Sequence, residues 1–266
     1  MNRVEHIGDA TLYLGDCFKI IGPMPLFDHV ITDPPYDAEA HTLQRRTLGL
    51  GISKSRKLEN SALPFPPLSG ADRELICTTV AYKASGWFLA FCQAESVGDW
   101  REAMVRSGAK WRRAGVWVKP DSSPQLSGDR PACGHEAIAM SWCGRGRSHW
   151  NGGGSRAVWT FPKHDPGFGH GGLANAHPTQ KPLRLMRKLV SDFTQAGETV
   201  CDLFMGSGTT GVACANLGRK FIGIEISEKY FQIACERIDA AYRQIRLFKD
   251  ESPLGARPET PLLPGV

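Results

Sequence analysis

The sequence predicts an α/β fold with one doubly wound, mostly parallel sheet of seven strands and helices on both faces. Short apolar runs alternate along the chain with longer stretches of helical periodicity, which is the order of βαβ units. Two of the apolar runs lead into turns rich in proline or glycine, and such turns hold ligands at the carboxyl ends of parallel strands. With 266 residues, 41% hydrophobic and 22% charged, the chain has the size and composition of one globular domain.

Each predicted strand is a short run dominated by apolar or β-branched side chains. In chain order the strands are expected at Thr11–Leu14, His29–Thr32, Trp87–Cys92, Ala114–Lys119, Glu136–Trp142, Thr199–Phe204 and Lys220–Ile226.

The predicted helices have apolar residues three or four positions apart on one face. The clearest one begins with Pro182 at its first position and repeats apolar residues from Leu183 to Phe193. Ser227 is a suitable cap for the last helix. The helices are expected at Ala71–Ala84, Ser96–Ser107, Pro182–Gln195, Thr209–Leu217 and Glu228–Phe248.

A carboxylate, two prolines and an aromatic ring follow the second predicted strand, as Asp33-Pro34-Pro35-Tyr36. This group suits methylation of an amino group on a nucleobase, a poor nucleophile because its lone pair is conjugated into the ring. Asp33 and the carbonyl of Pro34 would each accept one N–H of the amine, and Tyr36 would offer a face for stacking. Taken alone, the tetrapeptide is equally compatible with a simple Pro-Pro turn.

A second motif is typical of a cofactor cradle. The strand Thr199–Phe204 leads into Met205-Gly206-Ser207-Gly208-Thr209-Thr210 and a helix, so that backbone and helix N–H groups can approach a carboxylate. Glu225 follows the glycine turn at about 20 residues, the spacing at which an acid takes ribose hydroxyls. The loop is neither a G-x-G-x-x-G turn nor a phosphate loop with lysine, so a nucleoside with a carboxylate, such as S-adenosylmethionine, fits better than a polyphosphate.

With these motifs the chain resembles the β-class, or permuted, S-adenosylmethionine-dependent DNA amino-methyltransferases. The order of the motifs is specific, because the catalytic tetrapeptide precedes the glycine loop. The likeness runs from about Ala10 to Ile245 and implies a methyltransferase, or Rossmann-like, sheet. It rests on Gly15-Asp16-Cys17, Asp33-Pro34-Pro35-Tyr36, His177-Pro178-Thr179-Gln180-Lys181-Pro182, the segment from Asp202 to Thr210, and Gly223-Ile224-Glu225.

The resemblance also implies site residues. Glu225 would take the ribose hydroxyls and Asp16 the adenine amine of the cofactor, although Asp16 could also be a simple turn residue. The catalytic residues would be Asp33, Pro34, Pro35 and Tyr36. The cofactor-binding residues would be Asp16, Cys17, Asp33, Thr179, Lys181, Asp202, Phe204, Gly206, Ser207, Gly208, Thr209, Thr210 and Glu225.

Two long segments without periodicity flank these motifs in a catalytic domain expected at residues 1–250. Residues 41–70 are predicted as a flexible loop over the flipped base, and residues 145–173 as the target-recognition region, since loops this long are usually functional or disordered. Their basic side chains suit phosphate contacts, with a solvated surface as the alternative. The DNA-binding residues would be Arg45, Arg46, Arg145, Arg147, Arg156 and Lys163. Residues 251–266 are proline-rich and predicted to be disordered.

Composition favours a cytoplasmic protein. No apolar run reaches transmembrane length and the first residues do not form a signal peptide, so no membrane contact is expected. The eight cysteines include no C-x-x-C pair, which indicates buried free thiols. We expect no metal site, because Cys133, His135, Cys143 and His149 fit no standard zinc spacing.

The implied function is site-specific methylation of the N6 amine of adenine in double-stranded DNA after base flipping, because the tetrapeptide begins with Asp. Members that methylate cytosine N4 more often have Ser there, and this activity is the alternative. An RNA methyltransferase is disfavoured by the motif order, and a non-catalytic nucleic-acid-binding module by the intact motifs. The sequence decides neither whether the protein forms a homodimer nor whether it has a cognate restriction endonuclease.

Overall fold

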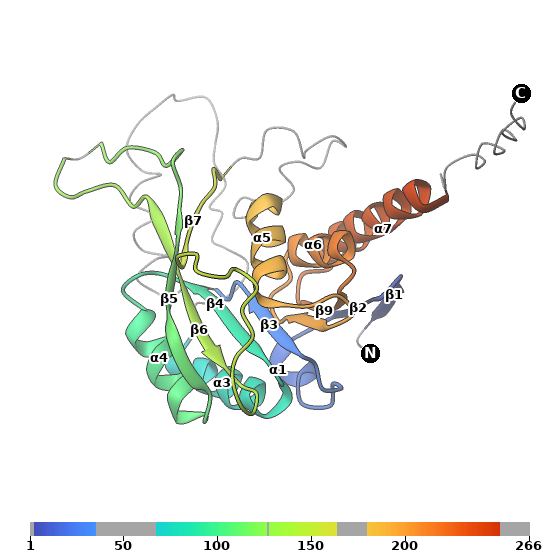
Figure 1. Ribbon diagram of the computed structural model, residues 1–266, viewed down its shortest axis with the longest axis horizontal. Helices are drawn as coiled ribbons and strands as arrows, with labels where there is room; N and C mark the ends of the chain where they lie inside the picture. Colours follow the sequence, from blue (N-terminus) through green and yellow to red (C-terminus); the bar gives the residue numbers. More distant parts are fainter. Residues whose placement is uncertain (1–2, 36–67, 127, 164–179, 251–266) are drawn as a thin grey trace, which may run out of the picture.

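The computed structural model describes residues 3–35, 68–126, 128–163 and 180–250, which build one nine-stranded sheet with helices on both faces (Figure 1). The strand order across the sheet is β1-β2-β9-β8-β3-β4-β6-β5-β7. The strands are β1 (Val4–Ile7), β2 (Ala10–Leu14), β3 (His29–Thr32), β4 (Trp87–Cys92), β5 (Lys110–Val118), β6 (His135–Trp142), β7 (Val158–Thr160), β8 (Thr199–Asp202) and β9 (Lys220–Glu225).

Most strand pairs are parallel. Neighbours run parallel from β2 through β9, β8 and β3 to β4, and β7 is parallel to β5. Strand β6 is antiparallel to both β4 and β5, and β1 is antiparallel to β2. The carboxyl ends of β2, β9, β8, β3, β4 and β5 therefore meet the first residues of β6 along one side of the sheet. We call this side the carboxyl edge and the opposite side the amino edge.

The doubly wound, mostly parallel sheet is confirmed, but it has nine strands where the sequence predicts seven. The additional strands lie at the two ends of the sheet. Strand β1 leaves Val4 exposed, and β7 buries only Trp159, so neither has a periodic apolar pattern. Strand β5 begins at Lys110, earlier than predicted. The sequence pattern misses these first residues because three of the four, Lys110, Arg112 and Arg113, are charged and exposed.

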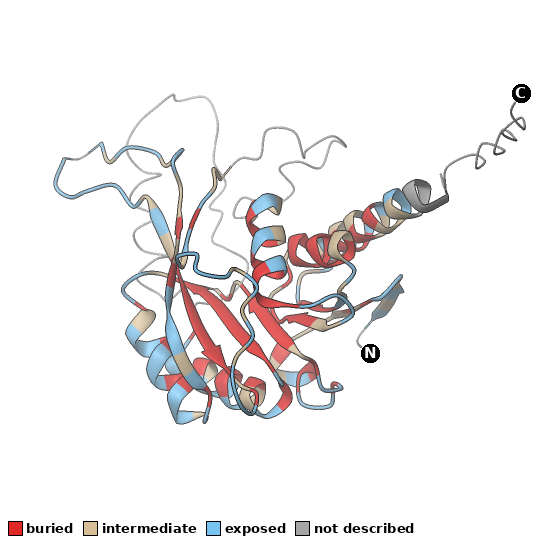
Figure 2. Ribbon diagram, viewed as in Figure 1, coloured by how far each residue is buried: buried red, intermediate tan, exposed pale blue. Residues whose placement is uncertain are grey.

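The helices cover the sheet in two groups (Figure 1). Val30 and Phe88 pack with α1, α3 and α4, whereas Ile31 and Leu89 pack with α5, α6 and α7. Adjacent strand residues thus face opposite layers, and the central strands β3 and β4 are buried on both sides (Figure 2). The helices are α1 (Cys17–Ile20), α3 (Gly70–Lys83), α4 (Val97–Arg106), α5 (Leu183–Phe193), α6 (Thr209–Leu217) and α7 (Glu228–Asp250), of which the sequence pattern misses only the one-turn α1.

The last residues of the predicted loop 41–70 form the start of helix α3. Ser69 Oγ accepts from Asp72 N and Asp72 Oδ2 accepts from Ser69 N, both at 3.1 Å, which is a capping box. Gly70 is therefore the first residue of α3 and not part of the loop, while residues 41–67 lie outside the described part of the chain. Of the helices in the described ranges, none is long and apolar enough to cross a membrane.

Candidate active site

Asp33 lies at the carboxyl edge, directly after the last residue of β3. The ammonium of Lys181 donates to Asp33 Oδ2, whereas Oδ1 is buried and has no hydrogen-bond partner among the described residues. Burial raises the pKa of the Asp33 carboxyl, and the nearby Lys181 charge opposes this shift. Burial also disfavours the Lys181 ammonium, but the carboxylates of Asp33 and Glu136 outweigh it and raise the pKa of Lys181. Lys181 therefore keeps its charge, and Asp33 presents one oxygen that no described residue bonds.

A buried carboxyl joins the catalytic strand to the glycine loop. Asp202, the last residue of β8, accepts from Thr32 Oγ1 at 2.8 Å, from Thr210 Oγ1 at 2.6 Å and from Phe204 N at 3.2 Å. These bonds tie β3, β8 and the first turn of α6 together. A carboxylate has about four acceptor positions, so at most one remains for the cofactor role predicted for Asp202.

The glycine loop leaves room for a ligand. Gly206 has a φ of +55°, and a Cβ at this position would meet no described atom within 4 Å, so the described part of the chain leaves the space beside Gly206 open. Gly208, with a φ of +79°, packs on α7 so closely that a Cβ would lie 2.9 Å from the Cβ of Ala234. The loop is therefore open on one side and held against α7 on the other.

Glu225 fixes the position of this loop. Its Oε2 accepts from Gly206 N and its Oε1 from Ser227 N, both at 2.8 Å. The side chain is buried, and burial raises the pKa of the carboxyl while the backbone donors oppose the shift. Two bonds leave acceptor positions free for hydroxyl donors such as those of a ribose.

Ser207 connects the loop to two distant segments. Its Oγ donates to Gln180 Oε1 at 3.1 Å and accepts from Arg237 Nη1 at 2.8 Å, and the same nitrogen lies 3.3 Å from Thr209 Oγ1. Burial lowers the pKa of Arg237 to about 10. The segment before α5 and helix α7 are thus both anchored on the glycine loop.

The remaining predicted residues near the cradle are Asp16, Cys17 and Phe204. Asp16 caps α1 by accepting from Phe18 N at 3.0 Å, which is the turn role that the sequence leaves open. The Cys17 side chain is buried in the core, and burial raises the pKa of its thiol to about 12. Phe204 is partly buried against the same core. Their contacts with a cofactor stay predictions.

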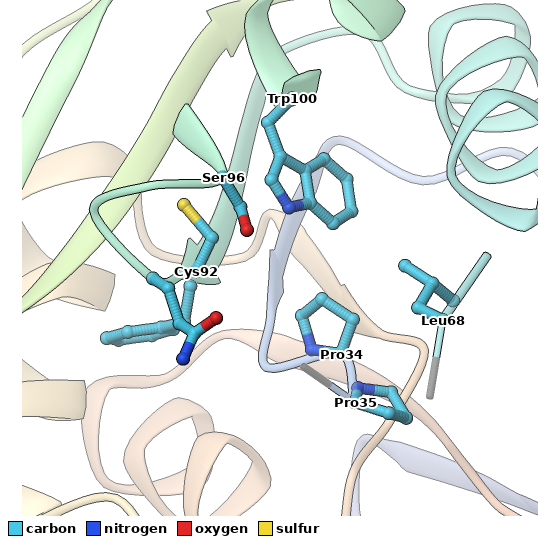
Figure 3. Close-up of a pocket in the computed structure, with 8 residues that line it drawn as sticks. Pro34, Pro35, Leu68, Cys92, Ser96 and Trp100 are labelled. Carbon is cyan, nitrogen blue, oxygen red and sulfur yellow. The ribbon is translucent and has the colours of Figure 1, made fainter. Parts of the chain in front are cut away.

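A small hollow lies beside the catalytic motif, on the α4 side of the carboxyl ends of β3 and β4 (Figure 3). Pro34 and Pro35 line one wall, and Cys92, Ser96 and Trp100 line the wall opposite. Pro34 is buried and Pro35 is half-buried in this packing, and their catalytic role stays a prediction. Predicted residues outside the described ranges are Tyr36, Arg45, Arg46 and Thr179.

The basic residues of the predicted recognition region lie at different edges. Arg145 and Arg147 are exposed and follow Trp142, which pairs with the first residue of β4, so they lie at the amino edge. Arg156 is exposed just before β7, which runs parallel to β5 back to the carboxyl edge. There Lys163 N donates to Asp121 Oδ1 at 2.8 Å. The described part of residues 145–173 is therefore not one surface, because a strand separates its two ends.

Glu136 contacts Lys181, Arg237 contacts Ser207 and Lys119 contacts Glu136, and all three are absent from the sequence-based set. Lys119 and Glu136 stand at the ends of two predicted strands, and a charged residue at a strand end is the signal that could have pointed to them. Arg237 lies within the amphipathic pattern of α7, and that pattern contains no signal for its contact with the loop.

The fold and the site define a Rossmann-like methyltransferase in which the catalytic motif precedes the glycine loop. The family model described as DNA methylase, of the N6 and N4 methyltransferases, matches residues 27–236, and the chain belongs to this family.

Curated relatives agree with this assignment. The type II methyltransferase M.XycI of Xanthomonas campestris pv. cyanopsidis is 33% identical over 153 residues, which cover 52% of this chain and 48% of the relative. The match thus spans about half the length of that relative. The type II methyltransferase M.HinfI of Haemophilus influenzae is 31% identical over 263 residues, covering 88% of this chain and 70% of the relative.

Among solved structures, the chain is similar to the crystal structure of the M1.HpyAVI-SAM complex. The TM-score is 0.64 at 25% identity, and the match covers 86% of this chain and 99% of that one.

Proposed function

We propose that this protein is a site-specific DNA methyltransferase that moves the methyl group of S-adenosylmethionine to the N6 amine of adenine in double-stranded DNA. The observation that carries the proposal is the buried Asp33 Oδ1, which has no partner among the described residues and directly follows a strand bonded to the glycine-loop strand. A buried acceptor without a donor is costly, and the amine of a flipped base supplies the donor.

Asp33 and the Pro34 carbonyl act on the target amine. Each accepts one N–H, which draws the nitrogen towards tetrahedral geometry and supports the positive charge that grows as it attacks. The new N–C bond forms as the S–C bond breaks, and the amine loses a proton afterwards. Asp33 is therefore a hydrogen-bond acceptor more than a strong base, because the amine becomes acidic only once it is methylated.

The cradle fits S-adenosylmethionine, which supplies an electrophilic methyl group when bound. The loop from Gly206 to Thr210 holds the methionine half in the open space in front of Gly206. Glu225 takes the ribose hydroxyls with its remaining acceptor positions, and Asp16 takes the adenine amine. The proposed methyl transfer requires no metal ion.

The target base follows from the first residue of the tetrapeptide. Asp33 favours adenine by resemblance, and cytosine N4 is the alternative outcome. Incubating the protein with S-adenosylmethionine and DNA from a host without DNA methyltransferases, then digesting the DNA to nucleosides for mass spectrometry, distinguishes N6-methyladenine from N4-methylcytosine. The proposal requires neither a homodimer nor a restriction endonuclease, and both stay predictions.

The role of Asp33 is tested by Asp33→Ala. We expect turnover to fall about a hundredfold or more, since an acceptor for transition-state charge is lost, while calorimetry shows that S-adenosylmethionine still binds. The matched control is Asp129→Ala, which removes an exposed carboxylate paired with Arg130 and should change neither quantity. Near-normal turnover of Asp33→Ala would exclude the assigned role.

A further inference from the structure

Four charged side chains at the carboxyl edge form a chain of alternating sign. Lys181 Nζ contacts Asp33 Oδ2 and lies 3.2 Å from Glu136 Oε2, and Lys119 Nζ contacts Glu136 Oε1. The exposed fractions of the side chains of Lys181, Glu136 and Lys119 are 8%, 13% and 14%. The Asp33 side chain is 27% exposed, and two carboxylates and two ammonium groups cancel in formal charge, which lowers the cost of enclosing them.

The hairpin of β5 and β6 supplies the far half of this chain. Glu136 is the second residue of β6 and lies opposite Trp117 of β5, while Lys119 follows the last residue of β5. The next residue of β6, Ala137, pairs with Cys92 at the carboxyl end of β4. The reversed direction of β6 thus places an acid beside the edge at which β3 ends in Asp33.

Lys181 is enclosed by two carboxylates and two aromatic rings. Its Nζ lies 4.9 Å from the ring centre of Phe91 and 6.0 Å from that of Trp117. An ammonium has three N–H donors. If Glu136 carried no charge, Asp33 would remain as a carboxylate in contact with Lys181 in the described part of the chain, and the ammonium could engage both of its oxygens. With Glu136 in place, Oδ1 has no partner among the described residues.

We propose, on the basis of the proposed function, that Glu136 is a positioning residue for methyl transfer. It shares the Lys181 ammonium with Asp33 and thereby keeps Asp33 Oδ1 open to the target amine. Lys119 holds Glu136 from the opposite side. Glu136 and Lys119 act on Asp33 through Lys181. They therefore orient the catalytic carboxylate although neither belongs to the catalytic tetrapeptide.

The charges give this arrangement a distinctive pH signature. The charged groups of the described residues that act on Asp33 are Lys181, Glu136, Lys119 and Asp202. After burial, which raises the pKa of Asp33 most, Glu136 raises it further and Lys119 lowers it. Removing the two charges one at a time should therefore move the ionisation of Asp33 in opposite directions.

The test is the pH profile of turnover for Glu136→Gln and Lys119→Gln, with radiolabelled S-adenosylmethionine and plasmid DNA from a host without DNA methyltransferases. For Glu136→Gln we expect kcat to fall about ten- to a hundredfold, the equivalent of one charge-assisted hydrogen bond. The midpoint of the acid limb should move to lower pH, because a like charge has left the neighbourhood of Asp33. For Lys119→Gln the midpoint should move to higher pH.

The matched control is Glu198→Gln at the amino edge, where the carboxylate bonds to His29 at 2.8 Å. This variant should lose stability on heating and keep the wild-type midpoint. If Glu136→Gln does not fold, Lys119→Gln and the charge-conserving Glu136→Asp still decide the question, because Glu136→Asp should keep the midpoint.

Wild-type midpoints in both Glu136→Gln and Lys119→Gln would overturn the inference. If Asp33→Ala is inactive in that case, the proposed function stands and only the positioning role fails. If Asp33→Ala still methylates DNA at a near-normal rate, Asp33 is not the acceptor for the target amine, and the proposed function loses the observation that carries it.

Discussion

The hydroxyl of Thr32 donates to the carboxyl of Asp202 at 2.8 Å, and both residues are buried. Thr32 is the last residue of β3 and stands directly before Asp33, whereas Asp202 is the last residue of β8 and begins the segment that leads into the glycine loop. Thr210 donates to the other oxygen of Asp202 at 2.6 Å and brings in the first turn of α6. One carboxyl group therefore sets the position of the catalytic motif relative to the cofactor loop.

Removing the Thr32 hydroxyl should destabilise the protein. Thr32→Val keeps the side-chain shape but leaves the buried Asp202 carboxyl short of a donor, which costs about 1–3 kcal/mol of unfolding free energy. Urea denaturation measures the change. Thr78→Val, at an exposed position of α3, is the control and should stay within about 0.5 kcal/mol of wild type. An equally small effect of Thr32→Val would mean that the bond does not support the fold.

Asp202 should also make stability depend on pH. Burial raises its pKa from 3.8 to about 6, so the folded protein holds this proton more tightly than the unfolded chain. The resulting stabilisation is complete below pH 3.8 and is lost as the pH rises through about 6. It amounts to about 3 kcal/mol from a difference of about two pKa units.

The measurement compares the unfolding free energy of wild type with that of Asp202→Asn, which cannot titrate, at several pH values across this range. The wild-type value should fall relative to the variant as the pH rises. Burial lowers the pKa of His29, which gives the opposite slope near its ordinary value of 6.5, but His29 is present in both proteins and cancels. Parallel curves would show that Asp202 does not carry the raised pKa.

Glu225→Ala should weaken binding of S-adenosylmethionine by about 1–3 kcal/mol, because hydrogen bonds from the ribose hydroxyls and from Gly206 N are lost together. Isothermal calorimetry measures this affinity. The control is Glu228→Ala, which removes an exposed acid three residues further on and should bind normally. Unchanged affinity in Glu225→Ala would leave Glu225 with a purely structural role.

The sequence predicts the centre of the sheet better than its margins, for a physical reason. Strands β3 and β4 are buried on both faces, so His29–Thr32 and Trp87–Cys92 read as continuous apolar runs with sharp ends. At the ends of the sheet one face or both meet solvent, and β1 and β7 lose that pattern. The motifs next to β3 and β8 were predictable because they follow such well-marked strands.

The partners of Asp33 were harder to predict, because they depend on how distant strands pair. Glu136 reaches the site because β6 is inserted between β4 and β5 and runs against both. Nothing in the local sequence around Glu136 encodes that order. Local pattern therefore indicates where a strand ends, whereas the charges that meet there follow from topology.

The last prediction concerns contacts with DNA. If the target base enters at Asp33, the duplex lies over the carboxyl edge, where Lys163 is placed by its backbone bond to Asp121. Lys163→Ala should weaken binding to all sequences and lower the salt slope by about one, as expected for the loss of a phosphate contact. Arg145→Ala and Arg147→Ala, at the amino edge, should leave both the affinity and the salt slope unchanged. Fluorescence anisotropy with a labelled duplex at several salt concentrations measures both quantities. A loss of salt dependence in the two arginine variants, with none in Lys163→Ala, would place the DNA on the other side of the sheet and contradict the assignment of the site to Asp33.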